Sequence, residues 1–364
     1  MKIDVSKSVL LKGITAVQNA ISIRSALPIL SNILLETSKD SLSIVGTDLD
    51  IGIIATIPVN ITTPGSITVP AKRFIDIIKE LPDAGVSISV KKNNMAHITC
   101  ENAQFKIMGI PKDEFPKLPE LKDKDMIKIS QVLFKSMLNM TSFAMSRDET
   151  RYILNGVYMV IKKNLLRMVA TDGRRLALTE REISLEKNIE KNLIVPAKTI
   201  QELIRNLKED GDLQISFGEN QVMFNLGDTV IISRLIEGEF PQYEQVIPKE
   251  TKDKVVVDRE KLLLATKRIS LLATQDSQAI KVDLDKNKMV VSKNSPDIGE
   301  ATEEIAINYS GEPLSMGFNP NYIMDVLKNL NDQVIEFELQ DPEKPGVIRT
   351  KEGYVYVVLP MQLA

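Results

Sequence analysis

Three stretches of the 364-residue sequence begin with the same pattern: VPAKRFIDIIKEL at Val69, VPAKTIQELIRNL at Val195 and NPNYIMDVLKNL at Asn319. Their prolines are 126 and 124 residues apart. Each stretch predicts a short amphipathic helix with proline in the first turn, where the missing N–H costs nothing. This regular spacing predicts three copies of one structural unit.

Other landmarks repeat with nearly the same spacing. The pair Thr47-Asp48 recurs 124 residues later as Thr171-Asp172. The pair Phe115-Pro116 recurs 125 residues later as Phe240-Pro241. Different landmarks that share one spacing indicate internal duplication.

A longer helix is expected near the start of each copy. Apolar residues at Leu10, Ile14, Val17 and Ile21 have offsets of 0, 4, 7 and 11, which describe one helical face, and the run from Leu133 repeats these offsets. Runs such as VSISV, LQISF and VIEFEL between the helices predict strands of antiparallel sheets. The sequence therefore predicts an α+β fold with two helices in each copy.

The repeats divide the chain into three predicted domains, 1–123, 124–249 and 250–364. The joints fall in charged, proline-containing stretches, KLPELKDKDM and VIPKETKDK, which are typical of short linkers. We expect copies this regular to pack side by side as an arc. The alternative is three independent domains with unrelated functions.

Composition excludes several classes of protein. One cysteine, Cys100, cannot form an internal disulfide and suits the reducing cytoplasm, and the one histidine, His97, leaves no Cys/His zinc site within a chain. No apolar run approaches the roughly 20 residues of a transmembrane helix, so we expect a cytoplasmic protein without membrane contact. The absence of tryptophan and an aromatic share of 5% argue against a surface that stacks single-stranded bases.

Charge is divided unevenly along the chain, whose net charge is −3. The six predicted helices together carry +8, so the remaining residues carry −11. If the helices share one side of an arc, that side attracts a polyanion. Lys and Arg at helical intervals contact phosphates rather than base edges, which predicts binding without sequence preference. The alternative is that these are ordinary solvated helix faces.

Motifs for enzymatic chemistry are missing from the sequence. It has no G-x-x-x-x-G-K-[ST] loop and no G-x-G-x-x-G turn, and its carboxylates match no metal-ligand spacing, so we expect no cofactor, no metal and no catalysis. In ATDGRRLAL, Asp172 stands beside two arginines, which leaves a hydrolase centred on Asp172 as an alternative. Thr-Asp-Gly also predicts a tight turn, in which Gly173 takes an unusual φ and Asp172 bonds local backbone.

The C-terminal sequence GYVYVVLPMQLA is mostly apolar, and Pro360 ends any strand just before Met361. One interpretation buries this end in a core. The other is an exposed groove in which Leu, Met and Pro bind short apolar peptides.

In combination, the VPAK repeats, RYILNG, ATDGRRLA, GEFPQY and the terminal YVVLPMQL resemble the bacterial DNA polymerase III beta subunit family, the sliding clamps. The resemblance runs from Met1 to the C-terminus and implies three clamp domains, each with two helices packed on antiparallel sheets. It also implies that two chains join head-to-tail into a ring with helices lining the hole.

The resemblance assigns three sets of residues. The partner-peptide pocket would comprise Leu154, Thr171, Gly173, Arg174, Arg175, Leu176, Pro241, Val246, Val357 and Leu359, with a neighbouring subsite at Asn319, Tyr322, Pro360 and Met361. The DNA contacts would be Arg24, Arg147 and Tyr152. The ring joint would set Phe105 and Ile107 of one chain against Leu271 and Leu272 of the other, with Lys72 and Arg73 pairing with Glu300, Glu303 and Glu304. The sequence departs from the common family pattern at Asp148, Ile153, Gln245 and Gln362.

The expected function is a processivity clamp that encircles duplex DNA without sequence preference and tethers the replicative polymerase. Its implied partners are double-stranded DNA, the DNA polymerase III catalytic subunit, the clamp loader, other polymerases and repair proteins with clamp-binding peptides, and a second copy of the chain. The main alternative is a peptide-binding scaffold that does not encircle DNA.

Overall fold

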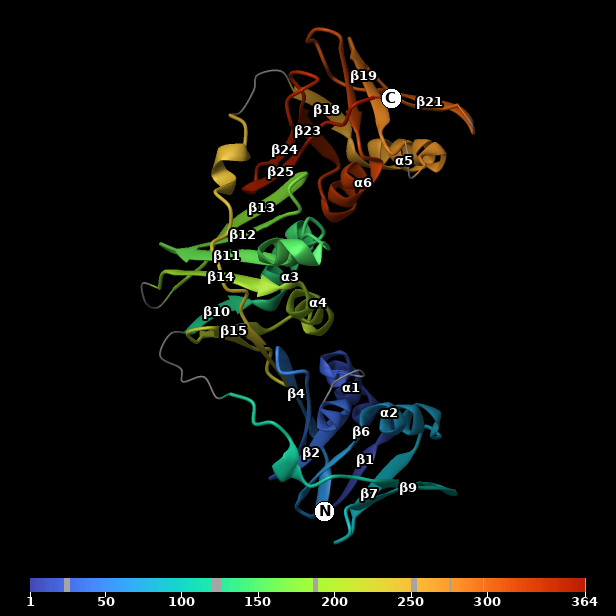
Figure 1. Ribbon diagram of the computed structural model, residues 1–364, viewed down its shortest axis with the longest axis vertical. Coiled ribbons are helices and arrows are strands. Elements are labelled where there is room, and N and C mark those ends of the chain that lie inside the picture. Colours follow the sequence, from blue (N-terminus) through green and yellow to red (C-terminus); the bar gives the residue numbers. More distant parts are fainter. Residues whose placement is uncertain are drawn as a thin grey trace. The chain divides into compact units, whose positions relative to one another are not determined.

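The computed structural model describes residues 1–22, 27–119, 126–185, 189–249, 254–274, 277–296 and 298–363. The chain forms two compact units, one built from 1–135 with 198–235 and the other from 136–197 with 236–364. Figure 1 shows the elements in chain order, from blue at the N-terminus to red at the C-terminus. Most of the predicted linker residues, 120–125 and 250–253, lie outside the described ranges.

The same order of elements occurs three times along the chain. Within the described residues, and apart from short 3-10 helices, each repeat has a strand that leads into a long helix, then four strands, a second helix and three further strands. The first repeat has one additional strand, β5. The first repeat contains β1 (Lys2–Ser6), α1 (Lys7–Val17), β2 (Asn32–Ser38), β3 (Ser41–Thr47), β4 (Ile51–Pro58), β5 (Asn60–Thr63), β6 (Ser66–Pro70), α2 (Ala71–Glu80), β7 (Gly85–Val90), β8 (Met95–Cys100) and β9 (Ala103–Met108).

The second and third repeats follow the first without the additional strand. The second contains β10 (Met126–Ser130), α3 (Gln131–Ser142), β11 (Gly156–Lys162), β12 (Leu165–Thr171), β13 (Arg175–Glu182), β14 (Lys191–Pro196), α4 (Ala197–Asn206), β15 (Asp212–Phe217), β16 (Gln221–Asn225) and β17 (Thr229–Arg234). The third contains β18 (Lys254–Asp258), α5 (Arg259–Ile269), β19 (Ile280–Asp285), β20 (Lys288–Ser295), β21 (Gly299–Ala306), β22 (Leu314–Phe318), α6 (Pro320–Asn329), β23 (Val334–Glu338), β24 (Gly346–Thr350) and β25 (Tyr354–Val358). The predicted α+β class and the two helices in each copy are confirmed.

In the first unit, antiparallel sheets carry helices α1 and α2. One sheet has the strand order β10-β15-β16-β17-β4-β3-β2-β6 and the other β5-β1-β7-β8-β9. The two helices lie side by side against the strands (Figure 1). Leu10, Ile14 and Val17 are fully buried on the face of α1 that packs on β3 and β4. This is the face that the sequence offsets predicted.

The second unit is built in the same way. Its sheets have the orders β14-β11-β12-β13-β25-β24-β23-β18 and β21-β20-β19-β22. Helices α5 and α6 pack against each other, and Leu262 and Ile269 of α5 are buried. Burial of these apolar faces is the main stabilising contribution to such a layered fold.

The two larger sheets each combine strands of consecutive repeats. The last strand of the second repeat, β17, pairs with β4 of the first, with Ile231 opposite Ile53. The last strand of the third repeat, β25, pairs with β13 of the second, with Val357 opposite Leu176. The second repeat therefore contributes to both compact units.

The prolines of the repeated motif occupy two different positions. Pro320 is the first residue of α6, as predicted. Helices α2 and α4 instead begin one residue after Pro70 and Pro196, which end strands β6 and β14. Either position needs no helical hydrogen bond from the proline nitrogen.

The buried face of α3 is shifted from the predicted one. Met137 is fully buried as expected, but Phe134 and Leu138 are buried where Leu133 was expected to be. The ring of Phe134 packs on that of Phe224, with centroids 6.0 Å apart. The larger aromatic side chain takes the core position, and Leu133 is only half-buried.

None of the helices in the described ranges has the length and apolar character of a membrane span.

Candidate functional site

An apolar pocket of about 510 Å³ opens in the second unit beside the turn between β12 and β13. This volume is typical of a site for a small ligand. The structure brings together all ten residues that the resemblance assigned to the main peptide pocket. They are Leu154, Thr171, Gly173, Arg174, Arg175, Leu176, Pro241, Val246, Val357 and Leu359.

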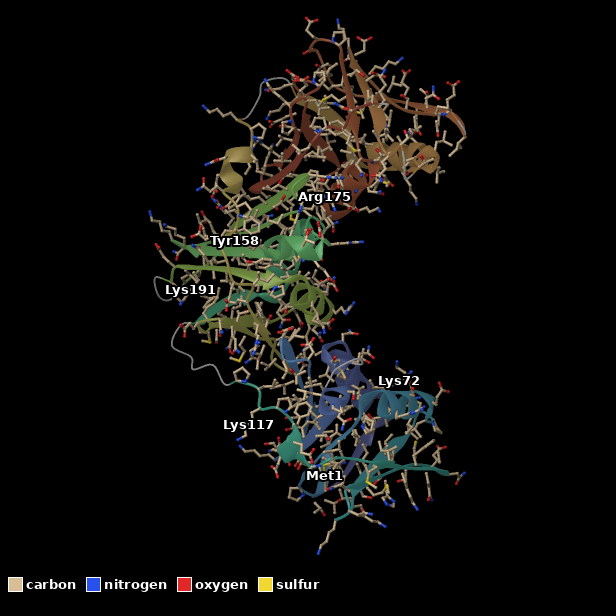
Figure 2. The ribbon with its side chains drawn as sticks, viewed as in Figure 1. Met1, Lys72, Lys117, Tyr158, Arg175 and Lys191 are labelled. Carbon is tan, nitrogen blue, oxygen red and sulfur yellow. The ribbon has the colours of Figure 1, made fainter. Side chains whose placement is uncertain are left out.

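The floor of the pocket is a continuous apolar cluster shared by two repeats. Leu176 on β13 and Val357 on β25 are directly opposite each other and both are 3% exposed. Tyr243 belongs to the same cluster, and Tyr158 and Phe240 stack beside it with ring centroids 4.7 Å apart. Figure 2 labels Tyr158 on strand β11. A floor made of packed rings and branched side chains is preformed, so a ligand need not order it.

The turn between β12 and β13 is fixed by its own side chains. Thr171 Oγ1 accepts a hydrogen bond from Gly173 N and donates one to Arg175 O. Asp172 Oδ1 accepts hydrogen bonds from the backbone N–H groups of Arg174 and Arg175 at 2.9 and 3.1 Å. Gly173 has a φ of 86°, where a side chain is strained. The predicted tight turn is confirmed.

Arg175 joins this turn to the third repeat. Its guanidinium donates to Asp172 Oδ2 at 3.1 Å, to Asp325 Oδ2 on α6 at 2.7 Å and to the backbone oxygen of Phe143 at 2.7 Å. The guanidinium also lies 4.4 Å from the ring centroid of Tyr322. Figure 2 labels Arg175 where β13 approaches α6. The side chain is 9% exposed, so these contacts are largely shielded from water.

The charge of Arg175 is maintained by its partners. Burial opposes the charge, but the hydrogen bond to Asp325 and the charges of Asp172 and Asp325 raise the pKa of Arg175 above its ordinary value. Tyr356 lies against the same group; burial raises its pKa, and its hydroxyl donates to the backbone oxygen of Tyr322 at 2.9 Å. Arg175 therefore holds the wall of the pocket in place, because its guanidinium donates to Asp172, Asp325 and the backbone oxygen of Phe143 and not to a ligand.

The rim of the pocket is exposed and partly apolar. Val246 is 55% exposed and Leu359 is 42% exposed. The side chain of Arg174 is exposed and has no hydrogen bond or ion pair within the described ranges. An apolar rim with the exposed guanidinium of Arg174 beside it suits a linear peptide with apolar side chains.

The expected neighbouring subsite is not part of this cavity. Asn319, which is 6% exposed, caps α6 by accepting from Asn321 N. Tyr322 is covered by Arg175. After β25 the chain runs past Pro360, and Met361 N donates to Gly317 O at 2.8 Å. Val357 is buried and Leu359 is exposed, so the C-terminal segment is only partly buried in a core; peptide binding by its exposed part stays a prediction.

Five residues line the pocket in addition to the ten assigned ones, and of these only Gln245 was expected at its rim. They are Gln242, Tyr243, Gln245, Pro248 and Pro345. The first three lie in or beside the GEFPQY motif, whose repeated Phe-Pro pair was a usable signal. No local pattern marks Pro345, because it precedes β24 and reaches the pocket through the pairing of β24 with β25 and of β25 with β13.

The expected DNA contacts are only partly described. Arg24 lies outside the described residues. Arg147 is exposed, and Tyr152, in the short helix Glu149–Leu154, is 57% exposed. Hydrogen bonds from Thr150 hold the pKa of the neighbouring Asp148 below its ordinary value, so a negative charge accompanies these two residues.

Five of the residues expected at the ring joint lie on two sheet edges, and the others lie on helices. Phe105 and Ile107 are on β9, the last strand of the five-stranded sheet, and Phe105 is 38% exposed. Glu300, Glu303 and Glu304 are on β21, the last strand of the four-stranded sheet. Leu271, 79% exposed, lies in the short helix Ser270–Leu272, and Lys72 and Arg73 are exposed on α2.

Two of these glutamates already have partners inside the chain. Arg268 forms a bidentate ion pair with Glu303, and Lys288 Nζ lies 2.7 Å from Glu304 Oε2. Glu300 has no ion pair in the part of the chain that the structure describes. We therefore expect Glu300 to be the most available of the three for a second chain.

Several cations on the helices are neutralised by acids from neighbouring segments. Lys135 on α3 pairs with Glu209 at 2.6 Å, Lys198 on α4 pairs with Asp48 at 2.5 Å, and Lys12 on α1 lies 3.6 Å from Asp228. The helix charge of +8 counted along the sequence therefore overstates the free positive charge of the helices. A net charge counted helix by helix along the sequence leaves out the acidic residues that the fold places beside each helix.

Within the described ranges, no cluster of His, Cys, Asp and Glu side chains could hold a metal ion.

Repeated units, sheets shared between consecutive repeats and a preformed apolar pocket define a protein built by internal duplication, with a cavity that can accommodate an apolar ligand. The chain belongs to the DNA polymerase III beta subunit family. The N-terminal domain of that family matches residues 1–119, the central domain matches 128–242 and the C-terminal domain matches 244–362.

Curated relatives and solved structures agree with this assignment. The chain is 32% identical over 363 residues to the beta sliding clamp of Chlamydia pneumoniae, covering 100% of this chain and 99% of that one. The crystal structure of the Bacillus subtilis DNA polymerase sliding clamp superposes with a TM-score of 0.95 at 33% identity, and all of both chains is covered. The Pseudomonas aeruginosa sliding clamp bound to griselimycin superposes with a TM-score of 0.94 at 33% identity, again over both whole chains.

Proposed function

We propose that this chain is a DNA sliding clamp. Two copies form a closed ring around duplex DNA, hold it without sequence preference and tether the replicative polymerase and other proteins through the apolar pocket. Membership of the beta subunit family supports this function, and the pocket that gathers ten assigned residues carries it. The clamp has no reaction of its own, and a separate loader supplies the energy for opening. The cytoplasm, expected from the lone cysteine, stays a prediction.

The internal symmetry of the sheets supports a ring of two chains. The last strand of a repeat pairs with the third strand after the first helix of the preceding repeat, as in β17 with β4 and β25 with β13. The last strand of the first repeat, β9, has no preceding repeat in its own chain, and the third strand after the first helix of the third repeat, β21, has no following one. Within the described residues both lie at the end of a sheet. A second copy supplies each missing partner, and two different edges joined in this way give a head-to-tail ring.

The side chains on the two edges are complementary. Strand β9 carries exposed Phe105 and Lys106, whereas β21 carries the three glutamates and lies near exposed Leu271. An apolar centre would drive association and the opposite charges would fix the partner and its direction. Phe105→Asp should therefore convert a dimer into a monomer in native mass measurement. A variant that stays dimeric contradicts this joint.

Retention on circular DNA tests the proposed function. A labelled clamp loaded on a nicked circle should remain bound during gel filtration and leave when a restriction enzyme cuts the circle, because a ring held by topology escapes at an end. A peptide-binding scaffold that does not encircle DNA would dissociate equally from both forms. Equal loss from circular and cut DNA would refute the clamp.

Binding of griselimycin, which a related clamp binds in its crystal structure, tests the pocket separately. We propose that it occupies the cavity of about 510 Å³, so Leu359→Ala should weaken binding by about 5- to 30-fold, the loss of roughly 1–2 kcal/mol of apolar contact. Leu264→Ala on α5 is a matched control, since Leu264 is 40% and Leu359 is 42% exposed. Equal effects of the two substitutions would place the ligand elsewhere.

A hydrolase centred on Asp172 finds little support. Both carboxylate oxygens are engaged, one by two backbone N–H groups and the other by Arg175. A general base must come within hydrogen-bond reach of the substrate proton, whereas these bonds hold the Asp172 carboxylate within the turn. We therefore expect no chemical turnover in the purified wild type and no change in Asp172→Asn.

A further inference from the structure

A wide groove crosses the first unit between helices α1 and α4. Its volume is about 1270 Å³, and it is open to solvent. Residues from α1, β4, α4 and the β16–β17 turn line it, among them Lys12, Asn19, Thr56, Glu202, Lys208 and Asp228. If the chain encircles DNA as proposed above, this is the helix side that meets the duplex.

Asp228 stands in this groove on a rigid support. It follows Gly227, whose φ is 97°, in the turn between β16 and β17, and its backbone oxygen accepts a hydrogen bond from Thr56 N at 2.8 Å. Its carboxylate lies 2.9 Å from Lys208 Nζ and 3.6 Å from Lys12 Nζ. One carboxylate thus bridges a lysine on α1 and a lysine that follows α4.

Electrostatics keep this carboxylate ionised. Burial alone would raise its pKa, but the hydrogen bond and charge of Lys208 and the charge of Lys12 outweigh burial and lower the pKa of Asp228 below its ordinary value. Both lysines remain accessible, with side chains 73% exposed for Lys12 and 40% for Lys208. An exposed ammonium pair around one anionic oxygen is the arrangement in which lysines bind a phosphate.

The other charged pair in the groove is arranged differently. Glu202 is 2% exposed and accepts hydrogen bonds from Asn19 and Arg205. Its carboxylate is packed into the wall of the groove. A ligand phosphate could not take over its hydrogen bonds without leaving a cavity in the core. Asp228 is 37% exposed and can be exchanged.

We propose that Asp228 is an internal competitor for a DNA phosphate. In the free protein its carboxylate occupies the position between Lys12 and Lys208; on DNA, the sugar–phosphate backbone takes over one or both lysines. The competition weakens each contact with the duplex and so favours sliding over a static grip. This inference rests on the proposed clamp function and assigns a specific residue to the control of mobility.

Diffusion of loaded clamps tests the proposal. Labelled rings loaded on long DNA with blocked ends are tracked one molecule at a time for wild type, Asp228→Asn and the matched control Asp212→Asn. Asp212 also pairs with a lysine, Lys128 at 2.8 Å, but lies outside the groove lining. Both substitutions change the net charge by the same amount.

The diffusion coefficient of Asp228→Asn should fall by about two- to fivefold, because the free energy of one exposed ion pair corresponds to a factor of this size. The diffusion coefficient of Asp212→Asn should equal that of the wild type. Adding Lys12→Gln and Lys208→Gln to Asp228→Asn should restore fast diffusion. The difference should shrink at high salt because the contacts are screened. Thermal unfolding of each variant shows whether the bridge is only structural.

Two results would overturn the inference while leaving the clamp intact. One is retention on circular DNA with equal diffusion of wild type and Asp228→Asn. The other is slow diffusion in Asp212→Asn as well, which would indicate net charge alone. Loss of retention on circular DNA in the wild type would instead refute the proposed function.

Discussion

Replacing Arg175 by alanine should loosen the junction between the second and third repeats. The substitution removes three hydrogen bonds, to Asp172, Asp325 and Phe143 O, and the stacking contact with Tyr322. Removing one partner of a buried ion pair typically costs about 3–5 kcal/mol. We expect the lower end, about 3 kcal/mol, because the Asp325 side chain is 34% exposed and Asp172 keeps its two backbone hydrogen bonds.

Hydrogen exchange measured by mass spectrometry locates this effect. A loss of about 3 kcal/mol accelerates exchange by roughly 100-fold where opening breaks the same contacts. The acceleration should be confined to peptides covering α6 and the β12–β13 turn, whereas α1, in the first unit, should exchange as in the wild type. Griselimycin affinity should fall as well, because the turn forms one wall of the pocket.

The neighbouring arginine provides the control. Arg174→Ala removes the same charge from the same turn, but its side chain is exposed and has no partner within the described residues. Exchange in α6 should not change. Equal exchange rates in wild type and Arg175→Ala would refute the role assigned to Arg175, as would equal acceleration by both alanine variants.

Two further predictions concern the turn and the histidine. Gly173→Ala places a Cβ at a φ of 86° and 3.0 Å from Arg151 Nη1, which should cost about 1–2 kcal/mol in thermal unfolding; Gly85→Ala, where nothing lies within 4 Å of the new Cβ, should cost less. Burial and the charges of Lys91 and Lys106 lower the pKa of His97 in the folded protein. The folded state therefore binds protons less readily than the unfolded state, and stability that is present above about pH 6.5 is lost as the pH falls. His97→Gln should remove this loss, so the melting temperatures of wild type and variant should diverge between about pH 7.5 and 5; parallel curves would contradict the shift.

Local patterns in the sequence predicted much of the fold. Helical offsets identified the buried face of α1, and alternating runs identified strands such as β7, β15 and β23, because both periodicities depend on neighbours close in the chain. The Thr-Asp pair predicted the turn, since the hydrogen bonds of the Thr171 and Asp172 side chains described above are made within five residues. In α3 the same reasoning was right at Met137 but wrong at Leu133, because Phe134 packs on Phe224 and takes the core position instead.

Contacts between distant segments had no local signal. The pairing of β17 with β4 joins residues about 180 positions apart, and nothing near either strand marks the other. The groove anion Asp228 and its two lysines come from three separate segments. The ten pocket residues were assigned by resemblance to a family, because only a known fold could indicate that β13 and β25 lie together.

Pairing of strands across repeat boundaries has a consequence for how this chain can be divided. Separating the first repeat from the second would leave both β4 and β17 without a hydrogen-bonding partner, and separating the second from the third would do the same to β13 and β25. Each fragment would then expose an unpaired edge strand, whose free backbone N–H and C=O groups pair with other copies. A single repeat expressed alone should therefore aggregate. We expect the three repeats to fold as one chain and not as independent modules.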